Sequence, residues 1–139
     1  MIDPTDVADA ALARAVAAIA GAFPVTDTSA PAGDQPSKYV VLEWPAGKTR
    51  SGSLGAPEQH LTLPVRVRGV GRSSSPAAAR KLAQGAAHAV TAALLDRSVA
   101  ITGSGWIVAG RRELSDAGTD LVGELANSVV DLEFEVVPA

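Results

Sequence analysis

The sequence contains no cysteine and few aromatic residues. Without cysteine there can be no disulfide, no thiolate catalysis and no zinc site with cysteine ligands. Two Phe, two Trp and one Tyr are the only aromatic residues among 139, although 47% of the chain is hydrophobic. The core must therefore be built mainly from Ala, Val and Leu, whose small side chains allow thin, closely approaching layers.

The chain also lacks an excess of positive charge and a long apolar run. Lys and Arg number 12 against 15 Asp and Glu, which gives a net charge of −3 and no overall attraction for nucleic acid. No apolar run approaches ~20 residues, and Asp3 and Asp6 stand where an export signal would be basic. We expect one soluble domain over residues 1–139, with no membrane segment and no export signal.

The clearest pattern is the alternation of side chains from Leu61 to Gly71. The apolar members are Leu61, Leu63, Val65 and Val67, and the residues between them are Thr62, Pro64, Arg66 and Arg68. A period of two predicts a half-buried strand with Arg66 and Arg68 side by side on its open face. Pro64 has no N–H, so we expect it at a sheet edge or where no ladder hydrogen bond is needed. Gly69-Val70-Gly71 is predicted to form a turn.

Two segments combine helical spacing with a start signal. Asp3-Pro4 and Ser75-Pro76 each place a capping side chain before a proline at the first helical position. We predict helices over residues 4–20 and 76–95. Each carries an Ala-rich apolar stripe, so both are expected to pack on one face of a sheet.

The remaining segments predict further strands and two long connections. Strands are expected at residues 39–44, 99–102, 106–113 and 128–137, with a hairpin turn at 103–105. Residues 45–59 and 114–127 are predicted to be long irregular connections. The fold class is therefore α/β (α+β): a small mixed, mostly antiparallel sheet of four to five strands with two helices on one face.

The connection at residues 45–59 contains two incomplete catalytic motifs. Gly47-Lys48-Thr49 ends like a phosphate-binding loop, but Leu42 occupies the upstream glycine position and no helix follows. Ser51-Gly52-Ser53-Leu54-Gly55 is close to a nucleophile elbow, but Ser51 replaces its first glycine. Neither motif supports an enzyme.

This connection is instead a candidate partner-contacting loop, with Lys48, Arg50 and Leu54 as its candidate contacts. His60 and His88 each lack a second histidine or a carboxylate at metal-ligand spacing. We predict that both are surface or boundary residues. No enzymatic activity, no metal and no cofactor are expected.

The last predicted strand repeats the alternation with opposite charge. Val130, Leu132, Phe134 and Val136 share one face, and Asp131, Glu133 and Glu135 share the other. This acidic row is either solvated, paired with the arginine row inside one sheet, or paired with the arginines of another copy. Exposed pairs stabilise a fold by only ~0–1 kcal/mol each, so their number alone does not choose between these alternatives.

The order of elements resembles the tail terminator (tail completion) proteins of long-tailed bacteriophages, particularly those of actinobacterial hosts. The resemblance rests mainly on Leu63–Leu95, including Val65-Arg66-Val67-Arg68-Gly69-Val70-Gly71, and on the closing strand Val129–Val137. It implies a small mixed sheet with two helices, and a ring, usually a hexamer, at the head-proximal end of the tail. Such a ring stops polymerisation of the tail tube protein and meets the head-completion proteins.

The resemblance also implies a virion location, assembly in the host cytoplasm, and genome DNA passing through the ring without sequence-specific binding. A ring needs two different matching faces on each copy. The charge rows are the candidates for them: Arg66, Arg68, Asp131, Glu133 and Glu135. Two alternatives remain, another neck or head-completion protein and a small bacterial ligand-binding or enzyme domain. The second lacks paired carboxylates in an apolar context and a glycine-rich phosphate loop.

Overall fold

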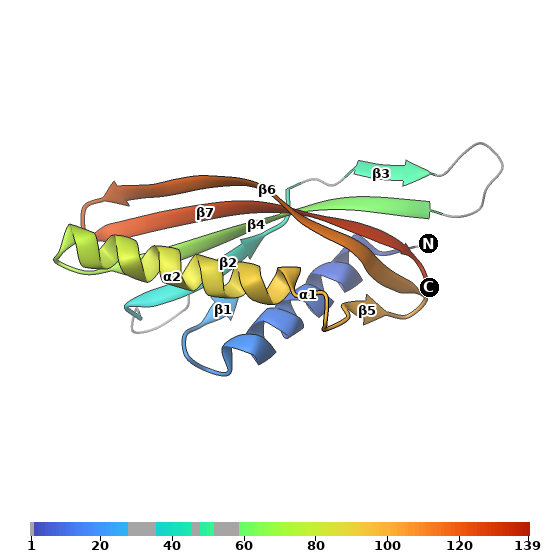
Figure 1. Ribbon diagram of the computed structural model, residues 1–139, viewed down its shortest axis with the longest axis horizontal. Helices are drawn as coiled ribbons and strands as arrows, with labels where there is room; N and C mark the ends of the chain where they lie inside the picture. The colour runs from blue at the N-terminus through green and yellow to red at the C-terminus, as the bar shows by residue number, and fades with distance from the viewer. Residues whose placement is uncertain (1, 28–35, 46–47, 52–58) are drawn as a thin grey trace.

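The computed structural model describes residues 2–27, 36–45, 48–51 and 59–139 (Figure 1). The elements in chain order are α1 (Pro4–Ile19), β1 (Val25–Thr26), β2 (Lys38–Glu43), β3 (Lys48–Ser51), β4 (Gln59–Arg72), α2 (Pro76–Leu95), β5 (Thr102–Gly103), β6 (Trp106–Val122) and β7 (Leu125–Pro138). No described helix combines the length and apolarity that crossing a membrane requires.

The strands form one sheet in the order β1-β2-β4-β7-β6-β5, with β3 paired to the outer part of β4. Within the described residues β1 and β2 run parallel, and every other neighbouring pair is antiparallel. The mixed, mostly antiparallel class agrees with the sequence-based prediction. The predicted count of four to five strands is wrong, because the described residues already form seven. The additional strands are β1, with two residues, and β3, with four.

Both helices begin as the capping signals indicated. The Asp3 side chain accepts a hydrogen bond from the Thr5 backbone N–H at 2.9 Å, and the Ser75 hydroxyl accepts one from Ala78 at 3.4 Å. These bonds satisfy backbone donors that have no partner inside a first helical turn. α2 then lies across β4 and β7, and α1 packs against α2 on the same face of the sheet (Figure 1).

The main core lies between this helical layer and the sheet. The helices contribute Val7, Ala11, Ala15, Ala86, Ala87, Val90 and Leu94; the longer strands contribute Val40, Leu42, Leu63, Val65, Val67, Val130, Leu132, Phe134 and Val136. Phe134 is the largest fully buried side chain among the described residues. The alternation predicted for β4 and β7 is therefore confirmed, and their charged residues face away from the helices.

Gly69 and Gly71 do not form the predicted turn, because β4 continues through them to Arg72. A Cβ atom on Gly69 would lie 2.3 Å from the Ala83 carbonyl oxygen, and one on Gly71 would lie 2.3 Å from that of Ala79. Both positions are too close for any real side chain. The glycines thus allow the backbone of α2 to rest directly on β4.

The prediction of an irregular connection at residues 114–127 is also wrong. β6 and β7 form one long hairpin that turns at Gly123, whose φ is +61°, and Val122 pairs with Leu125 beside the turn. Three register shifts along β6, at 108/110, 113/115 and 116/118, interrupt the alternation that would have indicated a strand. Beyond Ile107, the described residues place no strand on the outer edge of β6. Past Arg111 nearly all of its side chains are exposed, so few of them need to be apolar.

Pro64 lies inside the sheet, not at its edge. It stands opposite Glu133 of β7, while on its other side β2 ends with the pair Glu43 and Arg66 and β3 begins with Lys48 and Thr62. Pro64 therefore falls in the gap between β2 and β3. The missing N–H is tolerated where the ladder on that side is already interrupted, which was the second of the two predicted placements.

Candidate interaction surfaces

Among the described residues, the open face of the sheet, which faces away from the helices, carries three cross-strand ion pairs that involve arginine. Arg66 Nε donates to Asp131 Oδ1 at 2.9 Å, and Arg112 Nη2 donates to Glu133 Oε1 at 2.8 Å. Both pairs join residues directly opposite each other in the β4–β7 and β6–β7 ladders. Arg68 Nε donates to Glu43 Oε1 on β2. The arginine row and part of the acidic row are thus neutralised within one chain.

These pairs are electrostatically modest. The hydrogen bond from Arg66 to Asp131, with their charge attraction, raises the pKa of Arg66. The side chains are 39% and 27% exposed, so water screens their interaction. We assign each open-face pair about 0–1 kcal/mol of stability. These ion pairs favour the observed register of the strands but add little to the stability of the fold.

Glu135 is the least satisfied member of the predicted acidic row. Its side chain is 59% exposed, and its Oε1 lies 4.0 Å from His60 Nδ1 on β4. The structure therefore brings Arg66, Asp131 and Glu133 into pairs across the sheet and leaves Glu135 facing solvent. Whether this row contacts another copy remains a prediction from the sequence.

The candidate partner-contacting loop is only partly described. Lys48 and Arg50 lie on β3, whose backbone pairs with β4 through Thr62 and His60, so the prediction of a fully irregular connection is wrong here. Leu54 lies outside the described residues. The β3 segment extends the sheet beside the outer half of β4 (Figure 1).

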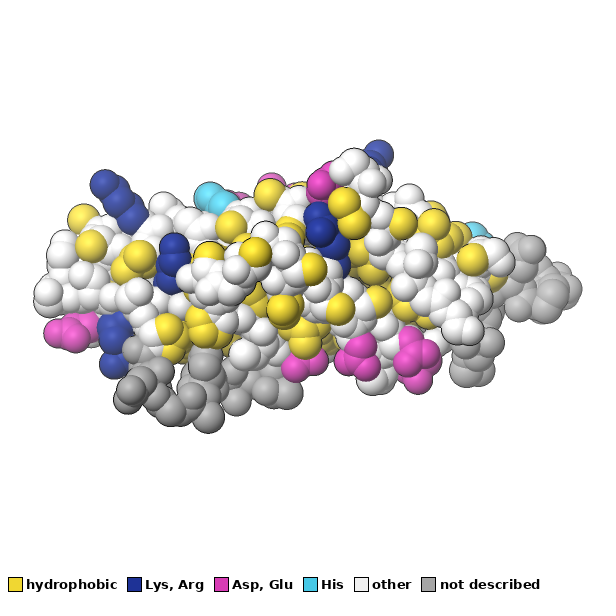
Figure 2. All heavy atoms as spheres, turned by 90° about the horizontal axis from the view of Figure 1, so that it is seen from below, with side chains coloured by type: hydrophobic (Ala, Val, Ile, Leu, Met, Phe, Trp, Pro, Cys, Tyr) yellow, Lys and Arg dark blue, Asp and Glu magenta, His cyan; other side chains and the backbone are white. Residues whose placement is uncertain are grey.

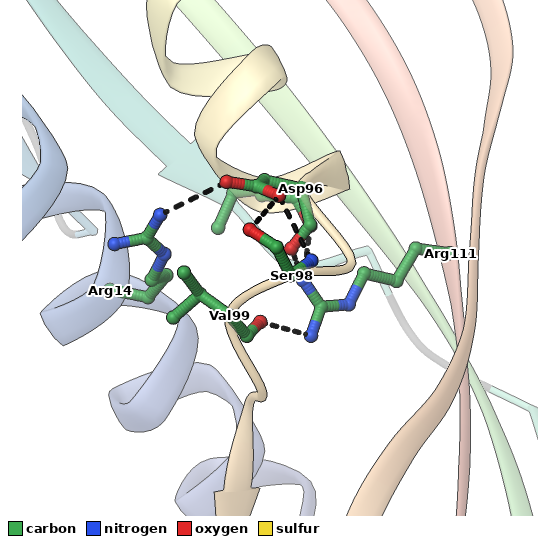
Figure 3. A network of polar contacts seen from close by, with 6 residues as sticks. Arg14, Asp96, Ser98, Val99 and Arg111 are labelled. Atoms are coloured by element: carbon green, nitrogen blue, oxygen red, sulfur yellow. Dashed lines mark hydrogen bonds and ion pairs between the residues drawn. The ribbon is translucent and has the colours of Figure 1, made fainter.

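Arg111 has a role that the sequence analysis did not detect. It is 7% exposed and points to the end of α2, as Figure 3 shows. Its Nη1 donates to the carbonyls of Leu94 at 3.3 Å and Asp96 at 2.6 Å, and its Nη2 donates to that of Val99 at 2.7 Å. Arg111 therefore caps the C-terminal carbonyl end of α2, which has no basic residue in its own last turn.

Arg14 and Asp96 extend this cap to α1. The Arg14 guanidinium lies 3.7 Å from Asp96, and Ser98 donates to Asp96 Oδ1 through its hydroxyl at 2.6 Å and its N–H at 2.9 Å (Figure 3). The Ser98 hydrogen bonds lower the pKa of Asp96, whereas burial lowers the pKa of Arg111. The cluster joins both helices to β6. Its function is to hold the layers together.

Replacing Arg111 with Met should reduce the free energy of unfolding by about 2–4 kcal/mol, because three carbonyls lose a charged donor in a buried place. Arg112→Met is the matched control, since the Arg112 side chain is 67% exposed and its pair with Glu133 contributes about 0–1 kcal/mol. Chemical denaturation of the two variants measures the difference. Equal midpoints would contradict the cap assigned to Arg111.

Both histidines lie at the surface or boundary, as predicted. His88 on α2 is exposed, and its Nε2 lies 3.2 Å from Asp116 Oδ2 on β6. His60 is half-buried beside Glu135. Among the described residues, no three His, Asp or Glu side chains are grouped as metal ligands would be.

Comparison with known proteins identifies the fold and no family. No protein-family model matches the chain, and no curated protein does. Among solved structures, the fold matches a chain from the virion of a native gene transfer agent (GTA) particle, with a TM-score of 0.60 and 18% identity. The match covers 88% of this chain and 84% of that chain. The two chains therefore share nearly their whole architecture.

Proposed function

We propose that this chain is a structural protein of a phage-like virion, and specifically a tail terminator. The observation that carries the proposal is the fold match to a chain of a virion particle, which extends over 88% of this chain. The sequence resemblance to phage tail terminators points to the same class of particle. The proposed role is mechanical and needs no catalytic group.

In this role, copies of the chain form a ring, most simply a hexamer, at the head-proximal end of the tail tube. One rim of the ring contacts the last layer of tube protein and ends its polymerisation. The other rim contacts a head-completion or connector protein. The genome passes through the lumen without sequence-specific contacts, which suits a chain with a net charge of −3. Assembly takes place in the host cytoplasm.

A second position in the same particle is the main alternative. The solved structure is a whole virion, so a fold match to one of its chains fits any of its structural components. A neck or head-completion protein would also form a ring, but it would contact the portal and not the tube. The two positions differ in whether the chain belongs to the tail or to the head before the two are joined.

Labelling the chain in the virion that contains it separates these positions. Ala139 is exposed beside the end of β7, so a small tag added there should leave the fold intact. Electron microscopy of tails and heads isolated before joining should place the tag at the head-proximal tip of free tails. A tag found on tailless heads would favour the neck alternative, and one along the tube or at its distal tip would contradict both.

A further inference from the structure

The side of the molecule that carries the helices has unlike charges at two distant places. Arg80 and Lys81 are exposed on the first two turns of α2, beside Gly71 of β4. Asp9 of α1 and Asp27 lie near Leu63 of β4. Leu63 and Gly71 are eight residues apart on one strand, which is about 26 Å at ~3.3 Å per residue.

Figure 2 shows how charged side chains are distributed on this side of the molecule. Several Lys and Arg side chains lie toward the left end of the view, where an acidic group is also seen, and other acidic side chains lie along the lower edge just right of the middle. Arg80 and Lys81 are therefore too far from Asp9 and Asp27 of the same copy to pair with them. They remain available to a neighbouring molecule.

The stability of α2 does not explain its charges. The dipole of a helix favours acidic residues in the first turn and basic residues in the last. α2 has neither, and its two cations, Arg80 and Lys81, lie in its N-terminal half. Within the described residues, neither cation forms an ion pair, and neither do Asp9 and Asp27. This contrasts with Arg66, which is paired on the sheet face.

The surface around Asp9 and Asp27 also contains a cavity. A cavity of ≈360 Å³ opens beside the first turns of α1, and Thr5, Asp9, Asp27 and Trp44 are among its lining residues. Carboxylates at the wall of an open hollow attract a cationic side chain and leave room for its alkyl stem. A hollow of this size can receive the ends of an arginine and a lysine.

Between the two charged places the helical surface is small and apolar. Its exposed residues include Ala13, Val16 and Ala17 on α1, and Ala89 and Ala92 on α2. Val16 is the exposed large hydrophobic side chain of the two helices, at 48%. A second molecule can approach such small side chains closely.

We propose that copies of this chain associate head to tail through the helical side. Arg80 and Lys81 of one copy dock at the hollow of the next copy, opposite Asp9 and Asp27. The contact uses two different surfaces of each copy, so it is heterologous and closes into a ring when the rotation allows. It rests on the proposed terminator function and specifies how the ring is held together. It differs from the sheet-face contact predicted from the sequence, whose arginines already have partners within the chain.

Two complementary charge reversals test this contact. Variant one carries Arg80→Glu and Lys81→Glu, and variant two carries Asp9→Lys and Asp27→Lys. Each alone places like charges across every contact, so its association should weaken at least about tenfold. Mixed in equal amounts they should assemble again, because contacts between the two variants join either two reversed clusters or two original clusters, and opposite charges meet in both. Native mass spectrometry would show rings in which the two variants alternate.

The matched control is Arg66→Glu with Arg68→Glu on the sheet face, which should assemble like the wild type. Circular dichroism would verify that all three variants fold. Wild-type protein that remains monomeric up to about 1 mM, or reversal variants that assemble normally, would overturn the helical contact. Loss of assembly in the sheet-face variant alone would overturn it in favour of the sheet-face contact. None of these outcomes concerns the terminator role, which depends on the tail itself.

Discussion

Gly69→Val should unfold the chain under conditions in which the wild type is stable, with a loss of more than about 3 kcal/mol in the free energy of unfolding. A Cβ atom at this position would lie 2.3 Å from the Ala83 carbonyl oxygen and 2.8 Å from Ala87 Cβ. Both neighbours belong to α2, whose backbone cannot withdraw without opening the core over Val67 and Val90. Valine itself favours strands, so the loss would come from packing alone.

Gly85→Ala is the control for this substitution. Gly85 lies midway along α2 on its exposed side, and a Cβ atom there would meet nothing within 4 Å. Alanine should therefore stabilise the helix by about 0.5–1 kcal/mol. Thermal and urea denaturation would measure both variants. If Gly69→Val has the same melting temperature and urea midpoint as the wild type, α2 does not rest on β4 as described.

The parts of the fold that sequence reasoning located have strong local signals. α1 and α2 start with a capping side chain and a proline, and core residues alternate with more exposed ones along β7 and along β4 as far as Arg68. The Ala-rich composition also predicted thin layers. The Gly69 and Gly71 contacts with α2 show how thin they are. These signals depend only on residues that are close in the sequence, so they predict local structure without knowledge of the fold.

The errors occur where the sheet, and not the local sequence, determines the structure. The outer half of β6 has almost only exposed side chains, and its register shifts break the period of two, so its sequence resembled that of a loop. β1 and β3 are too short to show a pattern. Pairing to β7, β2 and β4 stabilises these strands. Such pairing joins residues that are distant in the sequence.

The candidate residues divide in the same way. Arg66 and Asp131 were identified as complementary, and the register shows that they pair directly across β4 and β7. Arg111 looked equivalent to Arg112 in the sequence. Its position opposite Phe134 turns it toward the core side, where it reaches the end of α2. A β-bulge upstream, between Val108 and Gly110, sets that orientation.

The largest functional effect is expected from removing the chain altogether. If the chain ends tail growth, virions assembled without it should have tube protein that polymerises past its normal end. Heads should be filled but tailless, because the surface that joins the tail is missing. Supplying the wild-type chain in trans should restore normal particles. Gly69→Val supplied in trans should not, and Arg112→Met should.

The distribution of tail lengths in such a deletion, measured by electron microscopy, tests the terminator role most directly. We predict free tails of variable and mostly greater length, with few joined to heads. Tails of normal, uniform length that fail to join heads would indicate the neck alternative. Tails of normal length joined to heads would contradict any role of this chain in ending the tail or joining it to the head.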